Sequence, residues 1–135
     1  MMQLRIAGTV ENSIVDGEGI RYTIFVQGCP HGCPGCHNPQ THDFQGGKLV
    51  DAAVLLKEIA SDPLLDGVTF SGGEPFCQAA ALAELGKQVH DLGLNLVTYT
   101  GYTLEQLLTD GREDWMALLN ETDILIDGRF EADKK

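Results

Sequence analysis

Three cysteines lie close together in a loop that reads Cys-Pro-His-Gly-Cys-Pro-Gly-Cys. Cys29, Cys33 and Cys36 are separated by small or turn-forming residues, so their three thiolates can surround one corner of a compact inorganic cluster. Iron–sulfur clusters usually take four cysteine ligands, and a set of three leaves one iron without a protein ligand. An open coordination position is where a metal centre does its chemistry. The spacing therefore predicts a reactive iron–sulfur site.

Spacing alone leaves a second interpretation open, which is a structural zinc site. One of three nearby histidines could supply its fourth ligand, namely His31, His37 or His42, because Cys and His are the usual ligands of structural zinc. A glycine-rich turn further along the chain, Gly72-Gly73-Glu74-Pro75, weighs against this alternative, since a closed zinc site has no need of such a turn.

The elements expected around these residues alternate between strands and helices. Strands are expected over 21–27, 67–71, 94–100 and 123–126, and helices over 51–60, 76–92, 103–108 and 112–120. Such alternation predicts an α/β chain with right-handed crossovers and a mainly parallel sheet. The carboxyl ends of parallel strands meet at one edge of the sheet, where α/β proteins place their sites. Four loops should therefore share one face: 29–37, 72–75, 101–102 and 127–129.

Composition and charge narrow the class of protein further. The chain has 135 residues, of which 43% are apolar and 21% charged, and this indicates a single globular domain over residues 1–135. The formal charge of −11 argues against binding to nucleic acid, which depends on clustered Lys and Arg. No stretch predicts a membrane span or a signal peptide, so we expect a cytoplasmic protein with reduced thiols.

Together, the two motifs resemble the signature of the radical S-adenosylmethionine (SAM) superfamily, in spacing, order and strand context. The resemblance implies a partial (β/α) barrel. It also implies a 4Fe-4S cluster held by Cys29, Cys33 and Cys36, with the methionine end of SAM on the open iron. Reductive cleavage of SAM then gives a 5′-deoxyadenosyl radical. Since the cofactor does this chemistry, no side chain is expected to serve as acid, base or nucleophile.

The resemblance further implies SAM-binding roles in the glycine-rich turn and after the last strand. Gly72 and Gly73 would let backbone carbonyls approach the ammonium group of SAM, Glu74 would add negative charge, and Pro75 would fix the turn. After the last strand, the ribose or the methionine carboxylate would be contacted by Asp127 and Arg129, with an ordinary solvated turn as the alternative.

Many superfamily members place an aromatic residue before the third cysteine, where it packs on the adenine, but this chain has Gly35. We therefore expect His37, Tyr99 or Tyr102 to take that role. Two other reactive residue types have plainer interpretations. Cys77 is expected to be a small core or loop cysteine rather than a ligand, and His90 a surface residue of a helix.

Further segments resemble the glycyl-radical-enzyme activases. Residues 16–21 read Asp-Gly-Glu-Gly-Ile-Arg and match an Asp-Gly-x-Gly-x-Arg motif of that group. Activases with an inserted ferredoxin-like region are excluded, because no cysteine lies between Cys36 and Gly72. The short chain and its Leu-Ile-Asp-Gly segment most resemble the activating proteins of anaerobic (class III) ribonucleoside-triphosphate reductase. Family members continue to another strand, so the barrel is expected to lack its last strand unless the chain is truncated.

This resemblance implies an oxidoreductase that generates a glycyl radical on a large partner enzyme, with a one-electron donor such as flavodoxin. Anaerobic ribonucleoside-triphosphate reductase is the expected partner. Pyruvate formate-lyase or another glycyl radical enzyme is the alternative, as is a small molecule of the kind used by a deazaguanine-forming radical enzyme. The alternative from a different class is a non-catalytic zinc or iron–sulfur module.

Overall fold

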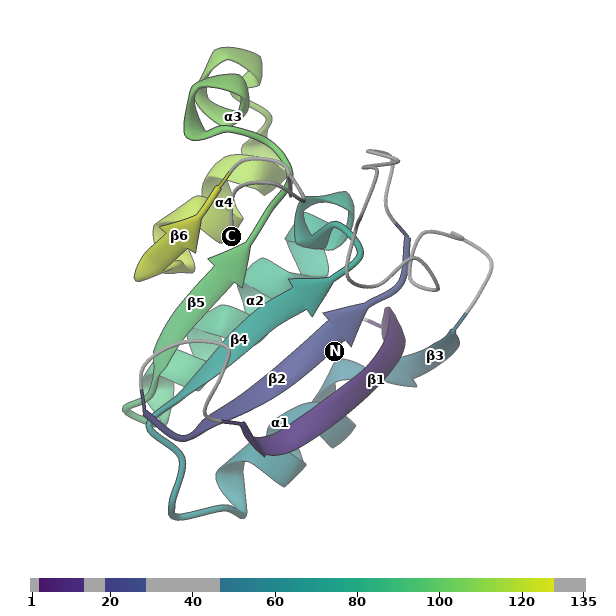
Figure 1. The fold of residues 1–135 in the computed structure, drawn as a ribbon, viewed down its shortest axis with the longest axis vertical. Coiled ribbons are helices and arrows are strands. Elements are labelled where there is room, and N and C mark those ends of the chain that lie inside the picture. The colour runs from purple at the N-terminus through teal and green to yellow at the C-terminus, as the bar shows by residue number, and fades with distance from the viewer. Residues whose placement is uncertain (1–2, 14–18, 29–46, 128–135) are drawn as a thin grey trace, which may run out of the picture.

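The computed structural model describes residues 3–13, 19–28 and 47–127, and these form one six-stranded sheet with helices packed on it (Figure 1). The strands are β1 (Gln3–Ser13), β2 (Arg21–Val26), β3 (Lys48–Asp51), β4 (Gly67–Gly72), β5 (Asn95–Tyr99) and β6 (Ile124–Ile126). The helices are α1 (Ala52–Ala60), the 3-10 helix η2 (Pro75–Gln78), α2 (Ala79–Asp91), α3 (Leu104–Asp110) and α4 (Glu113–Glu121).

The sheet is mixed, with the strand order β3-β1-β2-β4-β5-β6. Its larger part is parallel, because β2, β4, β5 and β6 pair in the same direction. β1 runs antiparallel to both β2 and β3. The α/β class and the mainly parallel sheet are thus confirmed. Over the residues that the structure describes, the sheet is open and does not close into a barrel.

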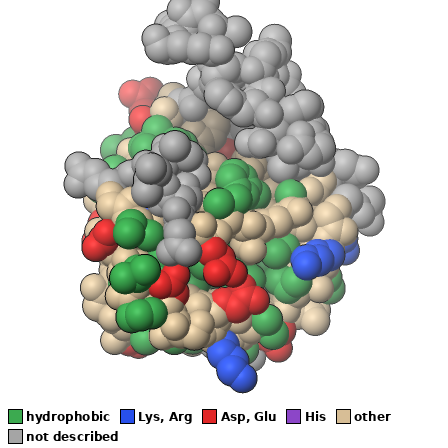
Figure 2. Space-filling view, turned by 60° about the horizontal axis from the view of Figure 1, so that its bottom comes forward, with side chains coloured by type: hydrophobic (Ala, Val, Ile, Leu, Met, Phe, Trp, Pro, Cys, Tyr) green, Lys and Arg blue, Asp and Glu red, His purple; other side chains and the backbone are tan. Residues whose placement is uncertain are grey.

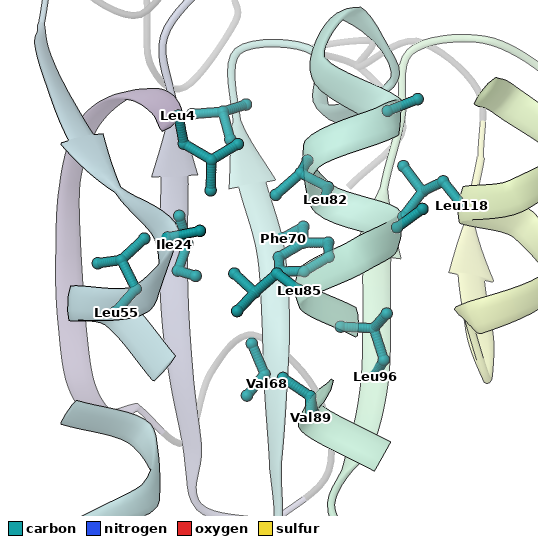
Figure 3. Packing of buried hydrophobic residues seen from close by; sticks show 14 of the residues in the cluster. Leu4, Ile24, Leu55, Val68, Phe70, Leu82, Leu85, Val89, Leu96 and Leu118 are labelled. Atoms are coloured by element: carbon teal, nitrogen blue, oxygen red, sulfur yellow. The ribbon is translucent and has the colours of Figure 1, made fainter. Parts of the chain in front are cut away.

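One face of the sheet carries the hydrophobic core and is covered by α1, α2 and α4 (Figures 1 and 3). Side chains alternate between the two faces of a strand, and Val68 and Phe70 of β4 both point to this face, where they meet Leu85 and Val89 of α2 (Figure 3). All four are fully buried. Burying an aliphatic or aromatic side chain of this size contributes about 1.5–3 kcal/mol, so this alternation fixes the register of β4.

The opposite face of the sheet is polar near the amino ends of the parallel strands. Arg21 of β2 is fully buried there; its Nε donates to Thr69 Oγ1 and its Nη2 to the carbonyl oxygen of Val68, both at 2.7 Å. Gly67 makes room for the guanidinium, because a Cβ at this position would lie 2.5 Å from Nη2. Arg21, the last residue of the activase-like motif, therefore ties β2 to β4.

Several predicted boundaries agree with the structure and others do not. Asp51 caps α1 as expected, its carboxylate accepting the N–H of Ala53, and Gly93 has a left-handed φ of 82° just after α2. The single helix predicted over 76–92 is instead η2 followed by α2, because the side chain of Glu74 caps a tight first turn that begins at Pro75. β1 and β3 were not predicted.

Among the residues that the structure describes, none of the helices has the length and hydrophobicity of a membrane span.

The space-filling view in Figure 2 shows Asp and Glu side chains near the middle of the face it presents, with Lys and Arg at few places. This distribution accords with the acidic composition.

Candidate cofactor site

The carboxyl ends of β2 and β4 are joined by backbone hydrogen bonds. The N–H of Gly73 donates to the carbonyl oxygen of Val26 (2.8 Å), and the N–H of Glu74 donates to that of Gly28 (2.7 Å). Gly28 directly precedes the first cysteine of the cysteine loop, Cys29. The sequence predicted that the cysteine loop and the Gly-Gly-Glu-Pro turn would begin at the same sheet edge, and the described strand ends confirm this.

The two glycines of the turn allow this close approach. Gly72 has a φ of 90°, which side chains rarely adopt, and a Cβ on it would lie 2.6 Å from the nitrogen of Val26. A Cβ on Gly73 would lie 2.3 Å from the carbonyl oxygen of Gly28. Both positions therefore require glycine, because the backbone of the turn packs directly on the backbone at the end of β2. From the sequence, these glycines were expected for a different reason, the close approach of a ligand.

Glu74 is fully buried, and its carboxylate reaches across to the end of β5. Oε2 accepts hydrogen bonds from the hydroxyl of Thr100 (2.7 Å) and the N–H of Phe76 (3.1 Å), and Oε1 accepts the N–H of Gly101 (2.7 Å). Sequence reasoning assigned Glu74 a role as negative charge near SAM. The structure adds that this carboxylate joins the β4 turn to the loop after β5.

An aromatic cluster supports the same turn from α4. Trp115 Nε1 donates to the carbonyl oxygen of Phe76 (2.9 Å), and the two rings meet edge to face with centroids 6.2 Å apart. The ring of Tyr102 lies 4.9 Å from that of Trp115, and the Tyr102 N–H donates to Thr100 Oγ1 (3.1 Å). The turn is thus supported from two sides, by the loop after β5 and by helix α4. Trp115 was not singled out from the sequence, and Thr100 was expected only as the last residue of the strand over 94–100.

The fourth predicted loop lies beside the third. Asp127 follows β6, is exposed, and accepts the N–H of Leu104 at the start of α3 (2.8 Å). The N–H of Thr100 donates to the carbonyl oxygen of Ile126 (3.0 Å). Asp127 therefore has a structural partner that explains its position at the strand end, and its contact with SAM stays a prediction.

The remaining predicted site residues fall outside the described ranges: Cys29, Cys33, Gly35, Cys36, His37 and Arg129. Cys77 is described; it lies in the first turn of η2 and is exposed. It lines a surface pocket with Gln78 and Asp114. The expectation of a core or loop position for Cys77 is therefore wrong, because the residue is exposed and lies in the 3-10 helix η2.

A second polar cluster lies at the other end of α2. His90 donates or accepts through both ring nitrogens, with Nδ1 2.9 Å from Glu121 Oε1 and Nε2 2.8 Å from Asp123 Oδ2. The hydrogen bond to Asp123 outweighs partial burial and, with that to Glu121, raises the pKa of His90. Partial burial by itself would raise the pKa of Asp123. The hydrogen bonds from His90 and from the Leu96 N–H outweigh it, so the pKa of Asp123 is lowered. His90 is thus more than the surface residue that was expected.

The oxygen-rich turn fits the polar end of an amino-acid cofactor. An ammonium group is bound by carbonyl oxygens and stabilised by nearby negative charge. The turn combines two residues without side chains with the negative charge of Glu74, whose carboxylate is buried and hydrogen-bonded within the protein. The chain reaches Cys29 one residue after Gly28. A cofactor that combines a thiolate-bound cluster with an amino-acid group bound by oxygen atoms therefore matches the types of residue at this edge of the sheet.

Comparison with known protein families identifies the general class of this chain. Residues 15–135 match the family described as "4Fe-4S single cluster domain". This favours the iron–sulfur interpretation of the cysteine loop over the zinc alternative.

Individual relatives then narrow the class. The anaerobic ribonucleoside-triphosphate reductase-activating protein of Pasteurella multocida is 38% identical over 129 residues, which cover 90% of this chain and 80% of the relative. The Haemophilus influenzae protein of the same name is 35% identical, with coverages of 87% and 78%. The pyruvate formate-lyase-activating enzyme of Clostridium pasteurianum is 36% identical over 93% of this chain, which spans about half (52%) of that enzyme.

The chain belongs to the family of anaerobic ribonucleoside-triphosphate reductase-activating proteins, within the glycyl-radical-enzyme activases of the radical SAM superfamily. Activating enzymes of this type are oxidoreductases, and their cofactors are a 4Fe-4S cluster and SAM.

Proposed function

We propose that this chain generates a glycyl radical on an anaerobic ribonucleoside-triphosphate reductase. The observation that carries the proposal is the pair of backbone hydrogen bonds that places Glu74 against Gly28, one residue before the cysteine loop. The turn and the residue that precedes the cysteine loop are thereby held at one edge of the sheet, and this supports a cofactor shared between the two motifs.

The proposed binding roles rest on the resemblance to the radical SAM superfamily and on the 4Fe-4S family match. Cys29, Cys33 and Cys36 hold the cluster. The Gly72-Gly73-Glu74-Pro75 turn binds the methionine end of SAM. When bound, the cluster and SAM supply reductive cleavage of the sulfonium bond and the hydrogen abstraction that follows it. Four further residues complete the site around SAM: Gly35, His37, Asp127 and Arg129.

The protein's own contribution is rigid placement. The carboxylate of Glu74 is fixed by donors from the loop after β5 and from η2, and the carbonyl of Phe76 is fixed by Trp115. These contacts leave the turn little freedom, so the oxygens that meet SAM need not reorganise when it binds. Preorganisation of this kind lowers the cost of binding.

We also propose that the sheet is the wall of a partial (β/α) barrel within a single domain over residues 1–135. In such barrels the helices lie on the outside and side chains fill the inside. Two observations support this proposal: α1, α2 and α4 cover one face of the sheet (Figure 1), and Arg21 and Thr69 are fully buried on the other face.

The partner and the electron source complete the proposal. The partner is a large glycyl radical enzyme, the electron donor is a carrier of the flavodoxin type, and the compartment is the cytoplasm. The charge of −11 and the few Lys and Arg side chains on the face in Figure 2 favour a protein partner over nucleic acid, which binds clustered basic side chains.

Anaerobic reconstitution tests this function. The protein loaded with iron and sulfide, then given a reductant and SAM, should release 5′-deoxyadenosine, and Cys33→Ala should abolish the release. Electron paramagnetic resonance should detect a glycyl radical on anaerobic ribonucleoside-triphosphate reductase only when the protein is present. A colourless protein that holds one zinc ion and releases no 5′-deoxyadenosine would contradict the proposal.

Pyruvate formate-lyase is the second candidate partner, because the Clostridium pasteurianum activating enzyme is 36% identical to this chain, within the range of the reductase activators compared above, which are 38% and 35% identical. The same assay with pyruvate formate-lyase separates the two. A glycyl radical on that enzyme, with none on the reductase, would reassign the target and leave the chemistry unchanged.

A further inference from the structure

Thr100 holds a buried hydroxyl whose direction is fixed by its neighbours. The residue is 5% exposed. Its Oγ1 lies 2.7 Å from Glu74 Oε2 and 3.1 Å from the nitrogen of Tyr102. A hydroxyl has one hydrogen to donate. Because the N–H of Tyr102 can only donate to Oγ1, the hydroxyl hydrogen is directed to the carboxylate of Glu74.

The bond between Thr100 and Glu74 connects two strand ends that share no backbone pairing at this point. β4 and β5 pair through Phe70 and Thr98, and beyond these residues the turn and the loop diverge. The N–H of Gly101 reaches the second carboxylate oxygen, Oε1, at 2.7 Å. Both oxygens of Glu74 are therefore held from the loop after β5.

Thr98, two residues earlier and within β5, provides a matched comparison. Thr98 is also fully buried, but its hydroxyl meets another hydroxyl, that of Thr122, at 3.0 Å. Hydrogen bonds to a charged group are roughly twice as strong as those between neutral groups. The strand preference of threonine accounts for Thr98, whereas Thr100 lies just after β5 and its hydroxyl bonds the predicted SAM-binding turn.

We infer that Thr100 is a positioning residue for SAM, which acts by holding the carboxylate of Glu74 and with it the Gly72–Glu74 backbone. This inference rests on the proposed function. Thr100 need not touch SAM, because its effect passes through Glu74. The backbone N–H of Glu74 is bonded to Gly28, so a turn released from Thr100 would also loosen its contact with the residue before the cysteine loop.

The experiment compares SAM affinity among threonine variants of the reconstituted protein, by equilibrium dialysis with labelled SAM and by the change that SAM causes in the resonance spectrum of the reduced cluster. Thr100→Val keeps the shape and removes the hydroxyl, and it should raise the SAM dissociation constant about tenfold or more. Thr100→Ser restores the hydroxyl and should return the constant to within about threefold of the wild-type value. Thr98→Val, the control, should leave it within about twofold.

Thr100→Ala is the second variant, because it leaves no methyl group against the carboxylate and separates the lost hydroxyl from a steric clash. Thermal unfolding of each variant shows that it is folded. Wild-type SAM affinity in folded Thr100→Val and Thr100→Ala would overturn the inference, as would equal weakening in Thr98→Val. If the wild-type protein itself binds no SAM, the proposed function fails instead, so the two failures are distinguishable.

Discussion

Gly73→Ala should destabilise the protein because the added methyl group has no space. Its Cβ would lie 2.3 Å from the carbonyl oxygen of Gly28, and 2.8 Å and 2.9 Å from the carbon and nitrogen of the same residue. All three neighbours are backbone atoms, so no side chain can rotate away. The turn and the end of β2 would have to move apart by about 1 Å to restore ordinary van der Waals contact.

That movement acts on two hydrogen bonds, from Gly73 to Val26 and from Glu74 to Gly28. Each such bond contributes about 0.5–1.5 kcal/mol, and overpacking in a well-packed region costs about 1–3 kcal/mol. We therefore expect the free energy of unfolding to fall by about 3 kcal/mol. Urea denaturation measures this directly, and for a small protein the midpoint should fall by about 1–3 M.

Gly8→Ala is the matched control, because a Cβ on Gly8 meets nothing within 4 Å and its φ is not in the left-handed region. Its urea midpoint should stay close to that of the wild type. A Gly73→Ala protein whose free energy of unfolding lies within about 0.5 kcal/mol of the wild-type value would refute the steric reasoning.

Two further predictions concern buried or paired charges away from the turn. Since the pKa of His90 is raised in the folded state, its contacts stabilise the protein fully below the unfolded pKa of about 6.5 and lose their effect as pH rises through the folded pKa. His90→Gln should therefore lower the free energy of unfolding at pH 6, measured by urea denaturation, by less than about 1 kcal/mol for a partly exposed pair, and leave it unchanged at pH 9. An equal loss at both pH values would contradict this. Arg21→Lys should lower the free energy of unfolding by about 2 kcal/mol or more, because one ammonium group cannot replace both the Thr69 and the Val68 hydrogen bonds. Thermal unfolding checks this, and an unchanged midpoint would show that lysine satisfies both acceptors.

The parallel part of the sheet could be predicted from the sequence because each of its strands is followed by a marked turn or helix. The buried pattern of β2 and β4, and Gly93 after α2, gave the right order and nearly the right ends. β1 and β3 were missed for a physical reason. β3 has four residues and pairs only with β1, so its structure depends on a partner far away in the sequence rather than on a local pattern.

The sequence predicted which loops lie together at the site but not which side chains in them are hydrogen-bonded. The alternation of strands and helices placed Glu74 and Gly101 at one edge of the sheet, and their hydrogen bond confirms it. The specific pairing of Thr100 with Glu74, and of Trp115 with Phe76, depends on side-chain directions after each strand ends, where periodicity gives no information. The signal available in the sequence was an acidic residue after one strand, Glu74, and a Thr-Gly pair, Thr100-Gly101, after the next strand.

The hydrogen bonds between the ends of β2 and β4 have a consequence for how such proteins can diversify. Gly28, which precedes the cysteine loop, and the Gly-Gly-Glu-Pro turn lie at the ends of neighbouring strands, so the connection between them, which contains β3 and α1, does not set their separation. Each doubling of a flexible connection costs only about 0.6 kcal/mol in closure entropy. A whole extra module could therefore be accommodated in this connection while these two strand ends keep their places, so chains of very different length could share this edge of the sheet.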